Sequence, residues 1–369
     1  MNIIYIEPFY TGAHKQWINT YKSKSSHYIK ILSLSGVHWK WRMHGAAITL
    51  SKQFIELKET YDLIVVSDML NVSLFKSLCQ NKIGETKIIT YFHENQISYP
   101  RSDKDTDKKL NRDLHYAFIN YTSALISDYN FFNSNYHLND FVNGLTTYLN
   151  KMPDKKNLET INIIKAKSSV LHIGFDAIKY NIDKKKQNEK PIILWNHRWE
   201  HDKNPEDFFN LLYKLKNNNI EFLLVILGES FTSYPDCFNI AKKQLKQEII
   251  HMGYCNSKKD YYKWLIKSDI IPVTSNQEFF GISVAEAISA GVFPVLPNRL
   301  SYPEILDINN NPEVFYSNNN ELYDKVEDYF INYKILRKST KKYIKLINRF
   351  DWNNMIDIYD KTFETYYKN

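Results

Sequence analysis

The chain has 369 residues, of which 43% are hydrophobic, and a formal net charge of +7. This length exceeds one ordinary core and predicts two domains, and no apolar run approaches the roughly 20 residues of a membrane span. Three scattered cysteines without a CxxC pair exclude a disulfide framework. Because residues 1–9 also lack a signal-peptide pattern, we expect a soluble cytoplasmic protein that binds no membrane.

The positive charge is concentrated in the first half of the chain. Residues 1–174 contain 21 Lys and Arg against 15 Asp and Glu, a net +6, whereas residues 175–369 contain 27 against 26, a net +1. A basic half suits a polyanionic partner, because each neutralised phosphate releases counterions. A solvated lysine-rich surface is the simpler explanation, and charge alone favours it.

Short apolar runs alternate with longer helical patterns along both halves, which is typical of parallel α/β sheets. The strands predicted in the first half are 3–6, 28–34, 63–67, 87–92 and 124–127. Those predicted in the second half are 192–195, 222–227, 249–252, 270–273 and 293–296. Each half therefore predicts a doubly wound sheet, whose ligands gather at the carboxyl ends of the strands.

Three polar segments of the first half are candidates for chemistry. Residues 7–14 follow the first strand, and His14 would either point at an acceptor or cap the next helix. Residues 38–42 mix aromatic and basic side chains, which suit a nucleobase and a phosphate, although the two tryptophans could equally be core. His93 follows the strand 87–92 and precedes Glu94, Asn95 and Gln96. A lone histidine is more often structural, but this position favours a functional role.

The domain boundaries follow from composition. A polar, lysine-rich stretch covers 151–167, order returns at 170–175, and an Asn-, Asp- and Lys-rich linker is predicted near 176–190. We therefore expect an N-terminal domain at 1–175, a second domain at 176–345, and a C-terminal helical segment at 346–369 that returns to the first domain. Two such domains would face each other across a cleft.

In the second half, a basic segment follows the strand 192–195. Arg198 and Lys203 are spaced so that one turn could aim both at a single diphosphate, with arginine as a planar fork and lysine as a point charge. The alternative is an ordinary basic loop that pairs with Glu200 and Asp202.

A second segment follows the strand 270–273 and suits phosphate binding. Gly281 lets the backbone pass close to a ligand, and the helix that begins there offers the N–H groups of Ile282 and Ser283 to phosphate.

Two carboxylates flank this turn. Glu286 is suitably placed to accept hydrogen bonds from a ribose diol, and Glu278 could hold sugar hydroxyls. Each glutamate alone would be read as solvated, but their order and spacing after Arg198 and Lys203 favour a donor site.

No metal or cofactor is expected. The alternating aspartates at 103–107 lack the glycine and glutamate of a calcium loop, and His197 and His201 have no third zinc ligand nearby. GxGxxG and GxxxxGK[ST] are absent from the sequence, which excludes the usual nicotinamide and ATP sites. Arg198 and Lys203 can take the charge of a leaving diphosphate without a metal.

The glutamates at 278 and 286, the glycine at 281, and the upstream Arg198 and Lys203 together resemble the donor site of glycosyltransferase family 4. This resemblance implies an α/β GT-B fold of two Rossmann-like domains and transfer with retention of anomeric configuration. It also implies that Arg198 and Lys203 bind the donor diphosphate, Glu286 the ribose and Glu278 the transferred sugar.

Segments 7–14, 38–42 and 91–96, with 196–203, resemble one subfamily more closely, the tRNA-queuosine α-mannosyltransferases. The resemblance assigns Gly12 to donor binding, although the usual second glycine is absent, and assigns a catalytic role to His93 beside Arg198, Lys203 and Glu278. The residues expected to bind the acceptor are His14, Trp39, Trp41, Arg42, Glu94, Asn95 and Gln96.

The implied reaction is transfer of mannose from GDP-mannose to the cyclopentene diol of queuosine in the anticodon of the tRNA for aspartate. The implied partners are this tRNA and the nucleotide-sugar, with no protein partner. One alternative is a family 4 enzyme with another nucleotide-sugar and a lipid or glycan acceptor, which predicts an exposed apolar surface on the first domain. The other is a catalytically silent tRNA-binding protein, which would not need the four donor-site residues.

Overall fold

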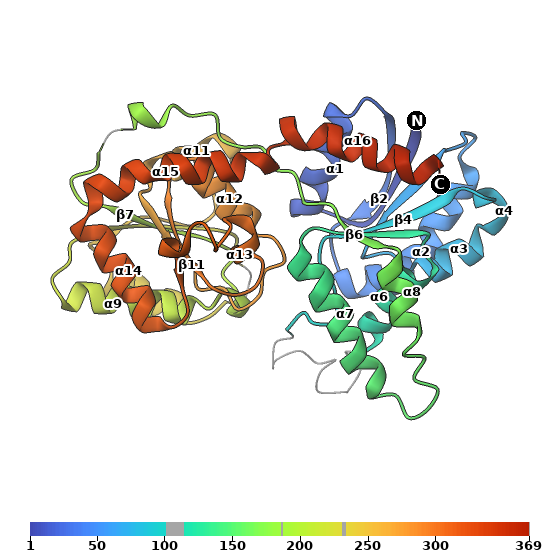
Figure 1. The fold of residues 1–369 in the computed structure, drawn as a ribbon, viewed down its shortest axis with the longest axis horizontal. Helices are drawn as coiled ribbons and strands as arrows, with labels where there is room; N and C mark the ends of the chain where they lie inside the picture. The colour runs from blue at the N-terminus through green and yellow to red at the C-terminus, as the bar shows by residue number, and fades with distance from the viewer. Residues whose placement is uncertain (101–113, 186, 231–233, 369) are drawn as a thin grey trace. The chain divides into compact units, whose positions relative to one another are not determined.

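The computed structural model describes residues 1–100, 114–185, 187–230 and 234–368, so the aspartates at 103–107 lie outside the described residues. The chain divides into two compact units (Figure 1). Unit 1 comprises Met1–Gly174 and Trp352–Asn369, and unit 2 comprises Phe175–Asp351. The boundaries predicted from the sequence were after residues 175 and 345, whereas the structure has them after residues 174 and 351.

Unit 1 is built on a six-stranded parallel sheet in the order β2-β1-β3-β4-β5-β6. Its strands are β1 (Asn2–Tyr10), β2 (Tyr28–Ser35), β3 (Leu63–Ser67), β4 (Lys87–Phe92), β5 (Tyr129–Phe132) and β6 (Ser168–Val170). The chain runs from β1 outward to β2 on one side and from β3 outward to β4 on the other. The direction of winding therefore reverses between β1 and β3, which is where open α/β sheets bind ligands.

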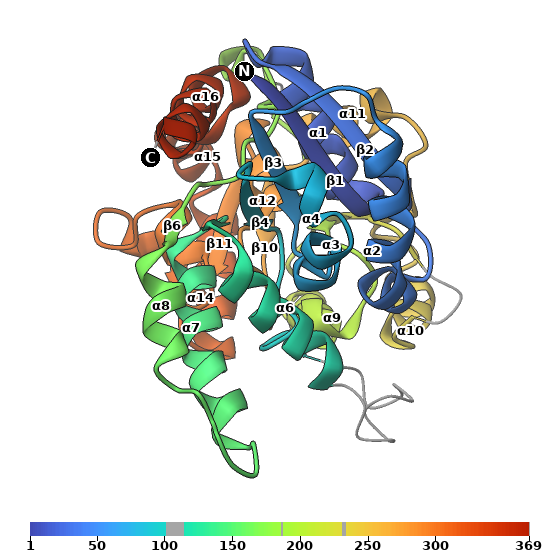
Figure 2. The same cartoon turned by 90° about the vertical axis from the view of Figure 1, so that its right-hand side faces the viewer.

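The helices of unit 1 cover both faces of this sheet. They are α1 (Gly12–Lys24), α2 (Trp39–Glu56), α3 (Val72–Leu78), α4 (Gln80–Ile83), α6 (Leu114–Ile126), α7 (Asn135–Asn150), α8 (Thr160–Ala166) and α16 (Trp352–Lys368). Ile4 and Ile6 of β1 pack in one cluster with α2 and α3. Ile3 and Tyr5, which alternate with them, face α1 and α16. Figure 1 and Figure 2 show α16 lying along the same face as α1.

Helix α16 is attached to α1 by buried polar contacts. The Trp17 indole N–H donates to the Tyr359 hydroxyl at 3.2 Å, and the Tyr21 hydroxyl donates to Asp360 Oδ1 at 2.9 Å. Asp360 Oδ2 also accepts from the backbone N–H of Ser26 at 2.9 Å. The C-terminal helix is thus an integral part of unit 1.

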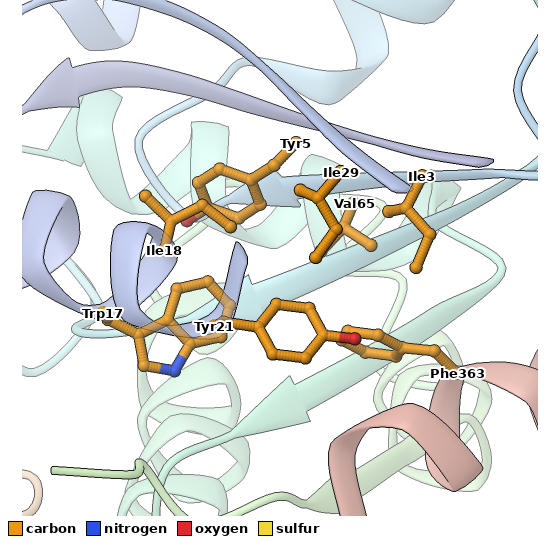
Figure 3. A pocket seen from close by; sticks show the side chains of 8 residues that line it. All are labelled: Ile3, Tyr5, Trp17, Ile18, Tyr21, Ile29, Val65 and Phe363. Carbon is orange, nitrogen blue, oxygen red and sulfur yellow. The ribbon is translucent and has the colours of Figure 1, made fainter. Parts of the chain in front are cut away.

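An enclosed apolar space lies between the sheet and these two helices (Figure 3). Its lining residues are Ile3, Tyr5, Trp17, Ile18, Tyr21, Ile29, Val65 and Phe363. It has no room for a water molecule, so it is a packing gap in the core and offers no ligand site.

Unit 2 holds a second six-stranded parallel sheet, in the order β12-β11-β10-β7-β8-β9. Its strands are β7 (Ile192–Asn196), β8 (Leu223–Leu227), β9 (Ile249–Met252), β10 (Ile270–Pro272), β11 (Phe293–Pro297) and β12 (Phe315–Tyr316). Its helices are α9 (Pro205–Asn217), α10 (Cys237–Gln244), α11 (Lys258–Lys267), α12 (Ile282–Ser289), α13 (Tyr302–Ile305), α14 (Asn319–Ile331) and α15 (Tyr333–Ile347). Helices α11, α12 and α15 cover one face, and α9 and α14 cover the other (Figure 1). Here the winding reverses between β7 and β10.

One predicted strand is wrong. Residues 124–127 were expected to be a strand, but Ala124 lies in the last turn of α6 and the strand begins at Tyr129. Ala124 is fully buried in the cluster beneath Phe132. The apolar run at 124–127 therefore contains the buried end of a helix. Over only four residues, periodicity cannot distinguish such a helix end from a strand.

The predicted linker 176–190 is part of unit 2. It contains the short 3-10 helix η1 (Ile182–Lys184), and the buried ammonium of Lys185 donates to the carbonyl oxygens of Ser268 and, at 2.9 Å, Gly291. In the part of the chain that the structure describes, no helix is both long and apolar enough to span a bilayer.

Candidate active site

The basic loop of unit 2 leaves the carboxyl end of β7 beside the end of β8. Gly228 has φ +110°, and a Cβ there would clash with the carbonyl oxygen of His197, so only glycine allows the two strand ends to meet. The Trp199 indole donates to the carbonyl oxygen of Leu227 at 3.1 Å and anchors the loop. Arg198 lies between His197 and Trp199, which are both held in place. Its side chain is 45% exposed, and its Nη2 lies 3.1 Å from Glu200 Oε2.

Lys203 is the buried cation of this loop. It ends the 3-10 helix η2 (His201–Lys203), is 7% exposed, and donates to the carbonyl oxygen of Gln277 at 2.7 Å. Its ammonium also lies 3.0 Å from Asp202 Oδ2 and 3.4 Å from Glu278 Oε2. Burial opposes ionisation of Asp202, but Lys203 outweighs it and holds the pKa of that carboxyl below its usual value. Lys203 therefore joins the two segments that the sequence singled out.

Glu278 shapes the turn before α12. Its Oε1 accepts from the backbone N–H of Phe279 at 3.2 Å and of Phe280 at 3.4 Å. Gly281 follows with φ +99° and forms the N-cap of α12, where it has no side chain to cap the helix. The N–H groups of Ile282 and Ser283 thus open a helix at the carboxyl edge of the sheet, as predicted for a phosphate site.

Glu286 lies one turn further along α12 and is 7% exposed. Its Oε2 accepts a hydrogen bond from the Tyr261 hydroxyl at 2.7 Å. Burial raises the pKa of Glu286 to about 7, although the Tyr261 hydrogen bond and Lys258 both oppose this rise. The carboxyl is thus poised between its charged and neutral forms near neutral pH.

The two histidines near the loop lie in different surroundings. His197 is buried and burial lowers its pKa to about 3, so it is neutral, with Nδ1 3.4 Å from Ser283 Oγ. His201 is exposed and lies 3.9 Å from Glu206.

In unit 1, the carboxyl ends of β1, β3 and β4 bring together a polar cluster centred on Glu7. Glu7 is fully buried. Its Oε1 accepts from Phe9 N–H and from Ser67 Oγ, both at 2.9 Å. Its Oε2 lies 3.1 Å from the Tyr5 hydroxyl and 3.0 Å from His14 Nδ1. His14 was a candidate from the sequence and Glu7 was not, although the position of Glu7 directly after a strand was a usable signal.

The rings of His14 and His93 have their centroids 4.1 Å apart and are tilted by 33° to each other. Burial lowers the pKa of His14, but the Glu7 carboxylate outweighs burial and raises that pKa to about 9. Burial and the neighbouring His14 keep the pKa of His93 well below its ordinary value. At neutral pH one ring is therefore charged and the other neutral. His93 Nδ1 is buried without a hydrogen-bond partner among the described residues.

Asp68 is a second residue that sequence analysis missed. It follows β3, is fully buried, and accepts from the backbone N–H of His93 at 2.9 Å through Oδ1. Its Oδ2 has no hydrogen-bond partner in the described part of the chain, and burial raises its pKa.

Within the described ranges, the one set of three side chains close enough to share a metal ion is Glu7, His14 and His93. In this arrangement both oxygens of Glu7 accept hydrogen bonds, and His14 Nδ1 lies 3.0 Å from one of them. Gly12, which precedes the group, has φ +50° and no heavy atom within 4 Å of an added Cβ. The backbone at Gly12 is thus open on the side where a ligand could approach.

The residues after His93 form a compact turn. Asn95 and Gln96 are buried, and Asn95 Oδ1 accepts from the backbone N–H groups of Ile97 and Ser98, both at 3.0 Å. Gln96 Nε2 donates to Glu94 Oε1 at 3.0 Å. Asn95 therefore shapes the loop, while Glu94 is only half-buried.

The aromatic and basic segment 38–42 is split between core and surface. Trp39 packs beside Tyr116 with ring centroids 5.1 Å apart, and joins a small apolar cluster. Trp41 is 65% exposed. Arg42 donates from Nε and Nη2 to the carbonyl and hydroxyl oxygens of Ser35, both at 3.1 Å. Trp39 is therefore partly buried against an apolar cluster, whereas Trp41 faces solvent.

Comparison with known proteins identifies both halves. Residues 2–175 match the family model described as tRNA-queuosine alpha-mannosyltransferase N-terminal, and residues 178–346 match glycosyl transferases group 1. The chain is 31% identical over 376 residues to the tRNA-queuosine alpha-mannosyltransferase of Drosophila melanogaster, an alignment that covers 98% of this chain and 97% of that one. The chain belongs to the tRNA-queuosine alpha-mannosyltransferase family.

Solved structures agree with the GT-B fold. Sucrose-phosphate synthase from Thermosynechococcus elongatus superposes with a TM-score of 0.71 at 10% identity, covering 99% of each chain. A glycosyltransferase from Rickettsia africae superposes with a TM-score of 0.67 at 18% identity, covering 100% of this chain and 98% of the other. At these identities the likeness shows the fold, and the α/β GT-B prediction is confirmed.

The family match also divides the candidate residues. The N-terminal family model covers the Glu7 cluster and the segment 38–42, whereas the group 1 model covers Arg198, Lys203, Glu278 and Glu286. A member of this family is a hexosyltransferase, so the expectation of an enzyme is confirmed. The roles of the individual residues remain predictions.

Proposed function

We propose that the chain transfers mannose from GDP-mannose to the cyclopentene diol of queuosine in the anticodon of the tRNA for aspartate, with retention of configuration. The observation that carries this proposal is the joining of Lys203 to Glu278 at the reversal point of the unit 2 sheet, in a chain of this family. A catalytically silent RNA-binding protein would have no need to bury a lysine between two carboxylates, because that arrangement costs desolvation.

The donor would bind in unit 2. Arg198, Lys203 and the N-terminus of α12 would take the diphosphate, whose negative charge grows as the sugar leaves. Glu286 would accept hydrogen bonds from the ribose, and Glu278 from the transferred mannose. Positive groups of the chain would supply this charge stabilisation, so the proposed reaction uses no metal or other cofactor.

The acceptor would bind to unit 1. The exposed Trp41 suits stacking with a base of the anticodon loop, and the charged ring of His14 suits donation to an oxygen of the acceptor. The neutral His93 would support the reacting sugar from its place beside His14. A lipid acceptor is less well supported, because residues 2–175 match a family model described for tRNA-queuosine alpha-mannosyltransferases.

Mass spectrometry of tRNA nucleosides after incubation with GDP-mannose tests the proposal directly. We expect a gain of one hexose on queuosine and none on tRNA with guanosine at the wobble position, which lacks the diol. The coupling constant of the anomeric proton in the product then reports retention. Transfer to a lipid or a free glycan, with none to queuosine tRNA, would contradict the proposed acceptor and leave the donor site standing.

A further inference from the structure

The carboxylate of Glu286 is held by a chain of hydrogen bonds that crosses three elements of unit 2. The Tyr261 hydroxyl, from α11, donates to Glu286 Oε2 at 2.7 Å. That hydroxyl in turn accepts from Asn196 Nδ2 at 2.9 Å, and the same amide donates to the carbonyl oxygen of Ser283 at 2.9 Å. Asn196 is the last residue of β7, and Ser283 belongs to α12 like Glu286. The chain therefore ties one oxygen of Glu286 to the end of β7.

This arrangement leaves the other oxygen available. Among the residues that the structure describes, no hydrogen bond to Glu286 Oε1 is observed, and the Tyr261 bond occupies a single lone pair of Oε2. A ribose offers two neighbouring hydroxyl donors. A carboxylate fixed at one oxygen presents its remaining lone pairs in a defined direction, at less cost in side-chain entropy than a free one.

The hydrogen bond also favours the charged form. Burial raises the pKa of Glu286, whereas the Tyr261 bond lowers it, since a hydroxyl donor stabilises the carboxylate. The other charged groups that act on this carboxyl are Lys258, also on α11, and Asp176. These two form an ion pair at 2.9 Å and act in opposite directions, so their effects largely offset. The neighbouring Tyr262 is neutral near pH 7, because burial raises its pKa.

We propose that Tyr261 is a positioning residue of the donor site, which orients the Glu286 carboxylate toward the ribose diol of the nucleotide-sugar. Tyr261 acts through Glu286 and does not itself contact the donor. This inference rests on the proposed role of Glu286 in ribose binding.

The test compares donor affinity across pH in wild type, Tyr261→Phe and Glu286→Gln. Titration with GDP-mannose is suitable, because its diphosphate has no proton that titrates near neutral pH. We expect wild-type affinity to rise by about 10-fold from pH 6 to pH 8, as the carboxyl ionises. Tyr261→Phe should weaken binding by about 10-fold at pH 7 and move the midpoint of the rise to higher pH. Glu286→Gln should abolish the rise.

Tyr343→Phe is the matched control. The Tyr343 hydroxyl also donates to a glutamate, Glu313 Oε1 at 2.6 Å, but from α15, which holds none of the predicted donor residues. Its removal should lower the melting temperature without moving the pH midpoint. Unchanged affinity and midpoint in Tyr261→Phe, with weak binding in Glu286→Gln, would overturn the role of Tyr261 alone. Normal binding in Glu286→Gln would instead overturn the ribose assignment on which it rests.

Discussion

Arg198 and Lys203 share a predicted role but sit in different surroundings. Arg198 is 45% exposed and pairs with Glu200 near the surface, so Arg198→Ala should leave stability almost unchanged. Turnover should nevertheless fall on the order of 100-fold, because a cation that stabilises the leaving diphosphate is lost. Steady-state kinetics and a melting curve measure the two effects separately, and near-normal turnover would remove Arg198 from the diphosphate site.

Lys203→Ala should lower both the stability of the fold and the rate of turnover. The substitution leaves the partly buried carboxylates of Asp202 and Glu278 without their cation, which typically costs about 3 kcal/mol of folding free energy. We expect a clear fall in melting temperature along with the loss of turnover. Lys190→Ala, which breaks an exposed pair with Glu221, should change neither quantity. A Lys203→Ala protein as stable as wild type would contradict the buried pairing.

The pair Glu7–His14 predicts a pH dependence of stability. The pKa of His14 is raised to about 9 in the folded chain, chiefly by Glu7 acting against burial, while an unfolded histidine titrates near 6.5. The stabilisation is therefore complete below about pH 6.5 and is lost as the pH rises through 9. Glu7→Gln keeps the shape of the side chain but removes its charge, so the contribution of the ion pair to stability disappears. The wild-type melting temperature should fall more steeply between pH 7 and 9.5 than that of the variant, and parallel curves would refute the ion pair.

The grouping of candidate residues in space was predictable to the extent that it depends on local spacing. Lys203 and Glu278 were chosen from their order along the chain, and the structure places them 3.4 Å apart. Glu7 and Asp68 were missed because their importance comes from contacts between the ends of β1, β3 and β4, far apart in sequence. Each alone has the pattern of a solvated carboxylate after a strand.

At the scale of elements, the surface of α2 can be tested without removing an aromatic ring. A Cβ at Gly45 would lie 2.8 Å from Trp41 Cζ2, so the exposed indole lies against the helix at this glycine. Gly45→Ala should therefore displace the indole while strengthening the helix, since alanine has the higher helical propensity. We expect weaker binding of tRNA with an unchanged or higher melting temperature.

Trp41→Ala should weaken tRNA binding to a similar or greater extent, without changing donor affinity. Ile48→Ala, at another exposed position of α2, serves as the control. If tRNA binds equally well to Trp41→Ala, Gly45→Ala and wild type, the indole is not part of the acceptor surface.

Most strands were predictable because the interior strands of a parallel sheet are apolar on both faces and form continuous runs. The strands β5, β6 and β12 were not predicted, because each has only two to four residues, and β5 and β6 also contain Asn or Ser. The run at 124–127 was assigned wrongly for the related reason that a buried helix end has the same composition. Short elements are decided by their tertiary neighbours.

For the whole molecule, the charge distribution predicts a salt-dependent interaction. Residues 1–174 hold a net +6 of the total +7. If they meet about three phosphates of tRNA, raising the salt from about 50 to 200 mM should weaken binding by about 20- to 40-fold through lost counterion release. Filter binding or fluorescence anisotropy measures this, and donor affinity measured in parallel should change much less. A tRNA affinity that is independent of salt would exclude phosphate contacts as its main source.

The attachment of α16 to unit 1 has a consequence for the order in which the chain folds. The side chains of Trp352, Tyr359 and Phe363 are part of the core of unit 1. The Tyr21 hydroxyl and the Ser26 backbone N–H donate their hydrogen bonds to Asp360. None of these partners leaves the ribosome until all of unit 2 has been synthesised. Unit 2 can therefore complete its core before unit 1 does. Until α16 is synthesised, one apolar face of the unit 1 sheet stays exposed. Chaperone binding during synthesis should accordingly concentrate on the first 174 residues, although they emerge first.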